Sequence, residues 1–136
     1  MGLDNAICVR RTPETNKIKE LVIFNQDYDK ELRYDFEVTY WRKCWNIRND
    51  IFGLGIGYDE SYYTNLTKEN IEQIIELLES YNDDNWYDGG SCIWEFTSEE
   101  DGWSYSEHIK QDIESLKLLR QLMDQYELEV YFYDSY

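Results

Sequence analysis

Proline, histidine and cysteine are all scarce in this chain, with one, one and three copies among 136 residues. The single histidine, His108, has no partner at a spacing that would let it activate a serine or cysteine nucleophile. The three cysteines are far apart, odd in number and form no CxxC pair, so they indicate neither a disulfide framework nor a zinc cluster. We therefore predict that the chain is not an enzyme and that it has no metal site and no cofactor.

Long apolar runs are also missing. No run approaches the roughly 18 residues that a transmembrane helix needs, and residues 1–11 lack the apolar stretch of a signal peptide. We therefore expect a cytoplasmic protein that makes no membrane contact. Hydrophobic residues make up 42% of the chain and aromatic residues 17%, which argues against disorder. The length predicts a single domain over residues 1–136.

Positive charge is nearly absent from the second part of the sequence. Residues 1–50 carry nine acids and nine lysines or arginines, whereas residues 51–136 carry 20 acids against four cations. The whole net charge of −16 therefore lies after residue 50. Within residues 51–108, 14 acids face the single cation Lys68, a balance of −13. Such a surface repels phosphate and attracts cationic partners, so we expect no direct nucleic-acid binding.

Local patterns predict an α+β fold with a single mixed or antiparallel sheet and about three helices packed mainly on one face. Short β-branched or alternating runs predict strands over residues 5–10, 20–25, 34–39, 91–97 and 128–133. Apolar residues at helical spacing predict helices over residues 40–51, 67–81 and 104–125. Gly53, Gly55 and Gly57 end the first helix and open a loop.

The helix over residues 67–81 has the clearest pattern. Thr67 is a suitable N-cap, and apolar residues from Ile71 to Tyr81 form one stripe. Four glutamates fall on the opposite face, and two acidic turns follow in the sequence. We predict that these carboxylates form the partner-binding surface: Glu69, Glu72, Glu76, Glu79, Asp83, Asp84, Asp88, Glu99, Glu100 and Asp101.

A calcium loop is the one metal motif that the spacing suggests. Asp84, Asp88, Gly89 and Glu95 match positions 1, 5, 6 and 12 of an EF-hand loop. Trp86 stands where the third position needs an oxygen ligand, and a strand rather than a helix is expected to follow. The broken pattern leaves our prediction of no metal site in place, with calcium titration as its test.

The acidic surface leads to a specific hypothesis about the partner. Glutamates on one helix face recur every ~4.5–6 Å, and duplex DNA carries about one charge per 1.7 Å of axis, so a rigid acidic face can resemble its field. We hypothesise an inhibitor that occupies the basic nucleic-acid channel of a nuclease or CRISPR-type effector. The partner would then be a basic protein, a nucleic-acid-binding enzyme.

Three segments resemble a family of small uncharacterised phage and prophage proteins. The chain opens Met-Gly-Leu-Asp, contains the segment Tyr40, Trp41, Arg42 and Lys43, and ends in an aromatic strand over residues 131–136. Asp134 and Tyr136 stand where the family has Ser and Trp. The resemblance implies a phage or prophage source and the cytoplasm of the host cell, but it transfers no catalytic residue.

Two alternatives remain open. An immunity or antitoxin protein that neutralises a basic toxin would show the same charge pattern. A small ligand-binding module would instead use the glycine loop and the aromatic residues, and it would have one deep pocket with convergent polar groups. The oligomeric state stays undetermined at this level.

Overall fold

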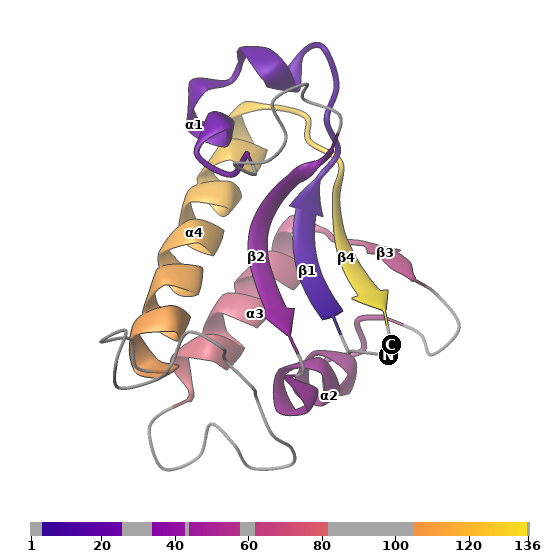
Figure 1. The fold of residues 1–136 in the computed structure, drawn as a ribbon, viewed down its shortest axis with the longest axis vertical. Coiled ribbons are helices and arrows are strands. Elements are labelled where there is room, and N and C mark those ends of the chain that lie inside the picture. The colour runs from indigo at the N-terminus through magenta and orange to yellow at the C-terminus, as the bar shows by residue number, and fades with distance from the viewer. Residues whose placement is uncertain (1–3, 26–33, 43, 58–61, 82–104, 136) are drawn as a thin grey trace.

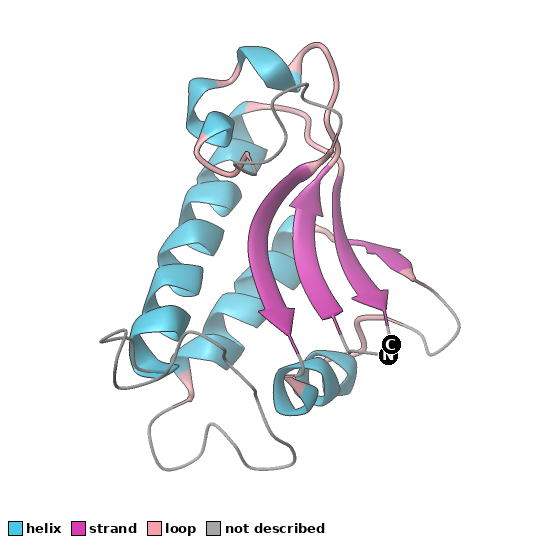
Figure 2. Cartoon of the chain, viewed as in Figure 1, coloured by secondary structure: helices cyan, strands magenta, loops and turns pink. Residues whose placement is uncertain are grey.

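The computed structural model describes residues 4–25, 34–42, 44–57, 62–81 and 105–135. Four strands form one antiparallel sheet in the order β2-β1-β4-β3, and the helices pack mainly against one of its faces (Figures 1 and 2). This arrangement confirms the predicted α+β class. The strands are β1 (Asp4–Val9), β2 (Phe36–Arg42), β3 (Tyr63–Asn65) and β4 (Val130–Ser135).

Three substantial helices accompany the sheet. They are α2 (Trp45–Gly53), α3 (Lys68–Glu79) and α4 (Tyr105–Gln125), and a 3-10 turn, η1 (Thr15–Lys17), leads into the short helix α1 (Lys19–Val22). In Figure 1, α3 passes behind the sheet and α4 is seen beside β2, while α2 lies at the end of the sheet near both chain termini. The opposite face of β1, β2 and β4 is turned toward the viewer, and no described helix crosses it.

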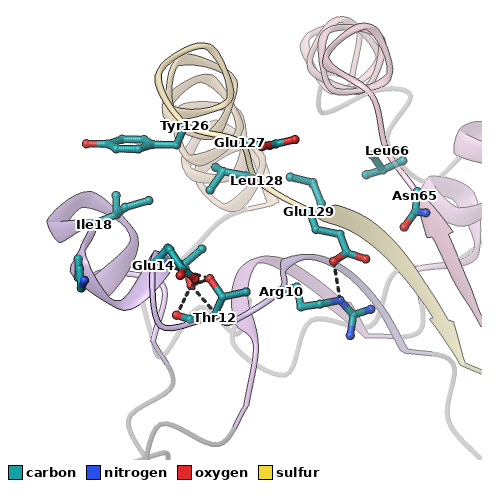
Figure 3. Close-up of a pocket in the computed structure, with 13 residues that line it drawn as sticks. Arg10, Thr12, Glu14, Ile18, Asn65, Leu66, Tyr126, Glu127, Leu128 and Glu129 are labelled. Atoms are coloured by element: carbon teal, nitrogen blue, oxygen red, sulfur yellow. Dashed lines mark hydrogen bonds and ion pairs between the residues drawn. The ribbon is translucent and has the colours of Figure 1, made fainter.

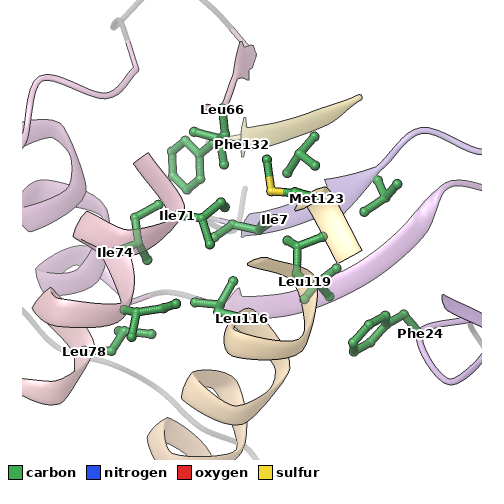
Figure 4. Packing of buried hydrophobic residues seen from close by; sticks show 14 of the residues in the cluster. Ile7, Phe24, Leu66, Ile71, Ile74, Leu78, Leu116, Leu119, Met123 and Phe132 are labelled. Carbon is green, nitrogen blue, oxygen red and sulfur yellow. The ribbon is translucent and has the colours of Figure 1, made fainter. Parts of the chain in front are cut away.

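The main core fills the space between the sheet and α3 and α4. Ile7 of β1 and Phe132 of β4 meet Ile71 and Ile74 of α3, and Leu116 approaches from α4 (Figure 4). All five side chains are at most 1% exposed. The apolar stripes predicted for the two long helices therefore do face the sheet, as burial of one helix face requires.

A β-bulge decides which residues of β2 enter this core. Pairing with β1 shifts between Ile7 and Cys8, which leaves Val38 as the extra residue of β2. Beyond the bulge the alternation is reversed, so Trp41 is fully buried while Tyr40 is 42% exposed. The prediction of a helix from residue 40 is wrong at its start, because residues 40–42 extend β2 and α2 begins at Trp45.

The strand predicted over residues 20–25 is also wrong. The backbone there bonds locally, with the Leu21 and Phe24 amides donating to the Ile18 and Leu21 carbonyls at 3.1 and 3.0 Å. These three residues are buried, whereas Val22 and Ile23 are 54% and 69% exposed. Burial every third residue is a helical period, which explains why α1 forms.

Other elements follow the predictions more closely. The first and last strands are confirmed as β1 and β4, and Gly53 is the last residue of α2. Gly55 and Gly57 then adopt positive φ values of 86° and 90°. The three-residue strand β3 lies where a loop was expected. The strand predicted over residues 91–97, the proposed calcium loop and the acidic turns after residue 82 fall outside the described residues.

Candidate protein-binding surfaces

Helix α3 is positioned by its cap and by its apolar stripe. The Thr67 hydroxyl accepts from the Asn70 amide at 3.1 Å, and the Asn70 side chain accepts from the Thr67 amide at 3.0 Å. This reciprocal capping box satisfies two amides that the helix leaves without internal partners. With Ile71, Ile74 and Leu78 buried, the four glutamates are left on the solvent side.

Contacts with α4 divide the four predicted glutamates into two pairs. Glu72 accepts from Arg120 Nε at 2.9 Å, and Glu79 lies 3.9 Å from Lys117 Nζ. Glu69 and Glu76 are exposed and make no ion pair within the described parts of the chain. The predicted row therefore exists on one helix, but only Glu69 and Glu76 lack an ion pair with another described residue.

A small charge network continues the Glu72 side of this surface. Asp124 lies 2.8 Å from Arg120 Nη1 and 3.0 Å from Lys68 Nζ. The Arg120 hydrogen bond, followed by that of Lys68, lowers the pKa of Asp124, so this carboxylate stays ionised. These pairs lie at the surface, where ion pairs contribute little to stability. They neutralise the positive charges of Lys68 and Arg120. The remaining predicted residues, Asp83, Asp84, Asp88, Glu99, Glu100 and Asp101, lie outside the described residues.

The face of the sheet that no described helix covers is a second surface, which the sequence patterns did not reveal. Strand register places Tyr40 of β2, Ala6 of β1, Tyr133 of β4 and Tyr63 of β3 in one row across all four strands. Residues paired in register project from the same face of a sheet. We call the side chains of this row, together with Cys8 and Tyr131, the tyrosine face.

The centre of the tyrosine face is a small apolar cluster separate from the main core. Ala6, Cys8 and Tyr131 are buried there, and Tyr133 packs at the edge. The Tyr131 hydroxyl donates to Asp35 at 2.6 Å, which carries its ring across the neighbouring strand. Burial, followed by Glu37, raises the pKa of the Cys8 thiol to about 12, so this cysteine is not a nucleophile.

Carboxylates lie beside the tyrosine face where β1 pairs with β2. Tyr40 donates to Asp4 at 2.6 Å, and Glu37 lies opposite Cys8 in the register. Burial raises the pKa of Glu37, and the nearby charge of Asp4 raises it further. Two carboxylates that repel each other would both gain from a neighbouring cation.

A groove of about 980 Å³ lies where the segment around η1 faces the end of α4 and the start of β4 (Figure 3). Ile18 and Leu128 supply apolar wall, and Arg10 pairs with Glu129 at 3.1 Å. Its volume suits a small ligand. Its charged side chains have both signs, however, and they do not converge on one point in the way a binding site for one ligand class requires.

Metal-binding clusters do not appear among the described residues. No group of three His, Cys, Asp or Glu side chains there could hold a metal ion, and Cys8 and Cys44 are buried. One strongly shifted acid is a structural group: Asp112 of α4 accepts from the buried Trp41 indole at 2.9 Å. Burial raises its pKa to about 7.

Comparison with known proteins gives no relative from which a role could be transferred. No family model, no curated protein and no solved structure matches the chain. In the described part of the molecule, no helix is both long and apolar enough to cross a membrane.

Proposed function

We propose that this chain is a non-catalytic inhibitor that binds a basic protein through its acidic surface. The observation that carries the proposal is the charge balance of the helical layer. Helices α3 and α4 together hold eight carboxylates and four cations. Three of those cations are already engaged with Glu72, Glu79 and Asp124, and Glu69 and Glu76 form no ion pair with any residue that the structure describes.

The narrower form of the proposal is that the partner is a nucleic-acid-binding enzyme, such as a nuclease or a CRISPR-type effector. Glu69 and Glu76 are two helical turns apart, about 10 Å along the axis. Their outward direction and the excess of acids over residues 51–108 support a surface that competes with phosphates for a basic channel. The phage resemblance agrees with such a role in the cytoplasm of a host cell.

Affinity capture with duplex DNA as a competitor tests this function. The immobilised chain is incubated with lysate of a candidate host at about 0.05 M and at about 0.5 M salt, and bound proteins are identified by mass spectrometry. The proposal predicts a basic protein that is retained only at low salt and is released by duplex DNA. Retention that is unaffected by both salt and DNA would contradict it.

Charge reversal supplies the matched variants. Glu69→Lys with Glu76→Lys should abolish capture, whereas Glu14→Lys with Glu20→Lys changes the net charge equally at exposed sites on another part of the molecule. Equal losses in both double variants would show that total charge, rather than the α3 surface, controls binding. An immunity or antitoxin role would give the same pattern with a toxin as the captured protein.

A further inference from the structure

The exposed rings of the tyrosine face lie at its two sides. Tyr40 on β2 is 42% exposed and Tyr63 on β3 is 59% exposed. Ala6 of β1, which lies between Tyr40 and Tyr133 in the row, is buried. Tyr63 is held by its neighbours, with ring centroids 5.4 Å from those of both Tyr131 and Tyr133. A rigid array of tyrosines offers large contact area at low entropic cost, which is typical of binding surfaces.

The charge of this face selects the kind of partner. Asp4 is the first residue of β1, whereas Asp35 and Glu37 flank Phe36 of β2, whose ring faces the core. The Tyr40 and Tyr131 hydroxyls donate to Asp4 and Asp35, so both carboxylates are anchored against the tyrosine face. Aromatic rings beside carboxylates are the surroundings that a desolvated cation needs.

The molecule already places its own guanidinium groups in such surroundings. Arg10 lies 5.5 Å from the Tyr131 ring centroid and pairs with Glu129 at 3.1 Å. Arg48 lies 4.4 Å from the Phe52 centroid and pairs with Asp134. In both cases one planar cation is held between a ring and a carboxylate, a combination that arginine satisfies better than lysine.

We propose that the tyrosine face binds arginine side chains of an extended basic segment in the partner protein, with the Tyr40 and Tyr63 rings as the stacking groups and Asp4 and Glu37 as the charged groups. The inference rests on the proposed function in one respect, since both require a cationic partner. It differs by placing this contact on the sheet, on the opposite side from the helical layer that carries Glu69 and Glu76.

A synthetic peptide of alternating arginine and serine is the probe, and its binding is measured by fluorescence anisotropy at about 0.05 M salt. The control peptide has citrulline in place of arginine, which keeps the planar shape and removes the charge. The wild-type chain should bind the arginine peptide and not the citrulline peptide. Equal binding of both, or binding of neither, would overturn the inference.

Variants then locate the site. Tyr40→Thr with Tyr63→Thr keeps residues that favour strands, and it should weaken arginine-peptide binding by about 5- to 30-fold, as expected for two exposed cation–π contacts. Tyr40→Phe should retain binding, because the ring remains. Tyr126→Thr removes an equally exposed ring, 41%, at the end of α4 and should have no effect. Circular dichroism and melting temperature confirm folding of each variant.

The charge reversals on α3 separate the two proposals. If Glu69→Lys with Glu76→Lys abolishes peptide binding while the tyrosine double variant matches the wild type, the sheet contact is wrong and the proposed function stands. If the tyrosine double variant loses peptide binding, but the wild-type chain captures no basic protein from lysate, the sheet contact stands and the proposed function fails.

Discussion

Replacing Asp112 by asparagine should stabilise the protein at neutral pH and change little in acid. Asp112 accepts from Trp41 Nε1 at 2.9 Å, and this hydrogen bond joins α4 to β2. Burial raises the pKa of Asp112 from 3.8 to about 7, and the indole hydrogen bond offsets only part of that rise. The folded protein therefore holds a proton on Asp112 at pH values where the unfolded chain has released it.

The magnitude follows from this difference in pKa. Below pH ~4 both states are protonated and Asp112 makes no pH-dependent contribution. As the pH rises from ~4 to ~7, the unfolded state gains by ionising, so the free energy of unfolding falls. The rise of the Asp112 pKa from 3.8 to about 7 corresponds to a loss of at most ~4 kcal/mol in the free energy of unfolding, reached above pH ~7. Asparagine keeps a carbonyl acceptor for Trp41 and removes the titration.

Urea unfolding of the wild type and of Asp112→Asn between pH ~4 and ~8 measures the effect. Any cost of burying the asparagine NH₂ group is the same at every pH. The measured quantity is therefore how the difference in free energy of unfolding between variant and wild type changes with pH. The variant should gain ~2–4 kcal/mol relative to wild type over this range. Glu114→Gln, at an exposed position of the same helix, should stay within ~0.5 kcal/mol throughout. A difference for Asp112→Asn that is constant with pH would refute the reasoning.

Three further predictions concern the frame that holds the two surfaces. Asp134→Asn should lower the free energy of unfolding by ~3–5 kcal/mol in denaturant titration, because it removes the carboxylate that lies 2.8 Å from the buried Arg48 guanidinium; an unchanged midpoint would contradict this. Thr67→Ala should cost ~1 kcal/mol by removing the N-cap of α3, while Thr67→Ser should cost much less in the same assay. Cys8, with its pKa raised to about 12, should resist iodoacetamide in the native protein at pH ~8 and react after unfolding, as followed by peptide mass spectrometry; rapid native labelling would show that the thiol is accessible.

Local signals in the sequence were sufficient to predict helix α3. Its cap, its apolar stripe and its solvent-facing glutamates depend on residues within about four positions of each other, which is the range over which helical patterns operate. The engagement of Glu72 and Glu79 with α4 could not be read in the same way. Arg120 is 48 residues from Glu72 in the sequence, so their contact depends on how the two helices pack.

The tyrosine face depended on register, which sequence periodicity does not supply. Tyr40, Tyr133 and Tyr63 share a row for two reasons. Strand β1, near the start of the chain, pairs with β4, near its end, and the three-residue strand β3 pairs with the other side of β4. The bulge at Val38 is equally decisive, since it turns Tyr40 outward and Trp41 inward. A slip of one residue in β2 would exchange those two side chains.

The buried polar contacts of the C-terminal strand could not be predicted from the sequence pattern. Asp134 has a specific structural role in this chain. It is 2% exposed and accepts from Arg48 at 2.8 and 3.1 Å and from Asn5 at 2.7 Å. The aspartate therefore joins α2 to the central strands, and a strand pattern alone gave no indication of that pairing.

The most direct test of the central claim is the association rate between this chain and its captured partner as a function of ionic strength. Attraction between an acidic surface and a basic protein mainly raises the rate of association. The association rate constant should therefore fall by about tenfold or more between about 0.05 and 0.5 M salt, while the dissociation rate constant changes little. Glu69→Lys with Glu76→Lys should already show the slow rate at low salt. An association rate that is independent of salt, and equal in wild type and variant, would contradict the account.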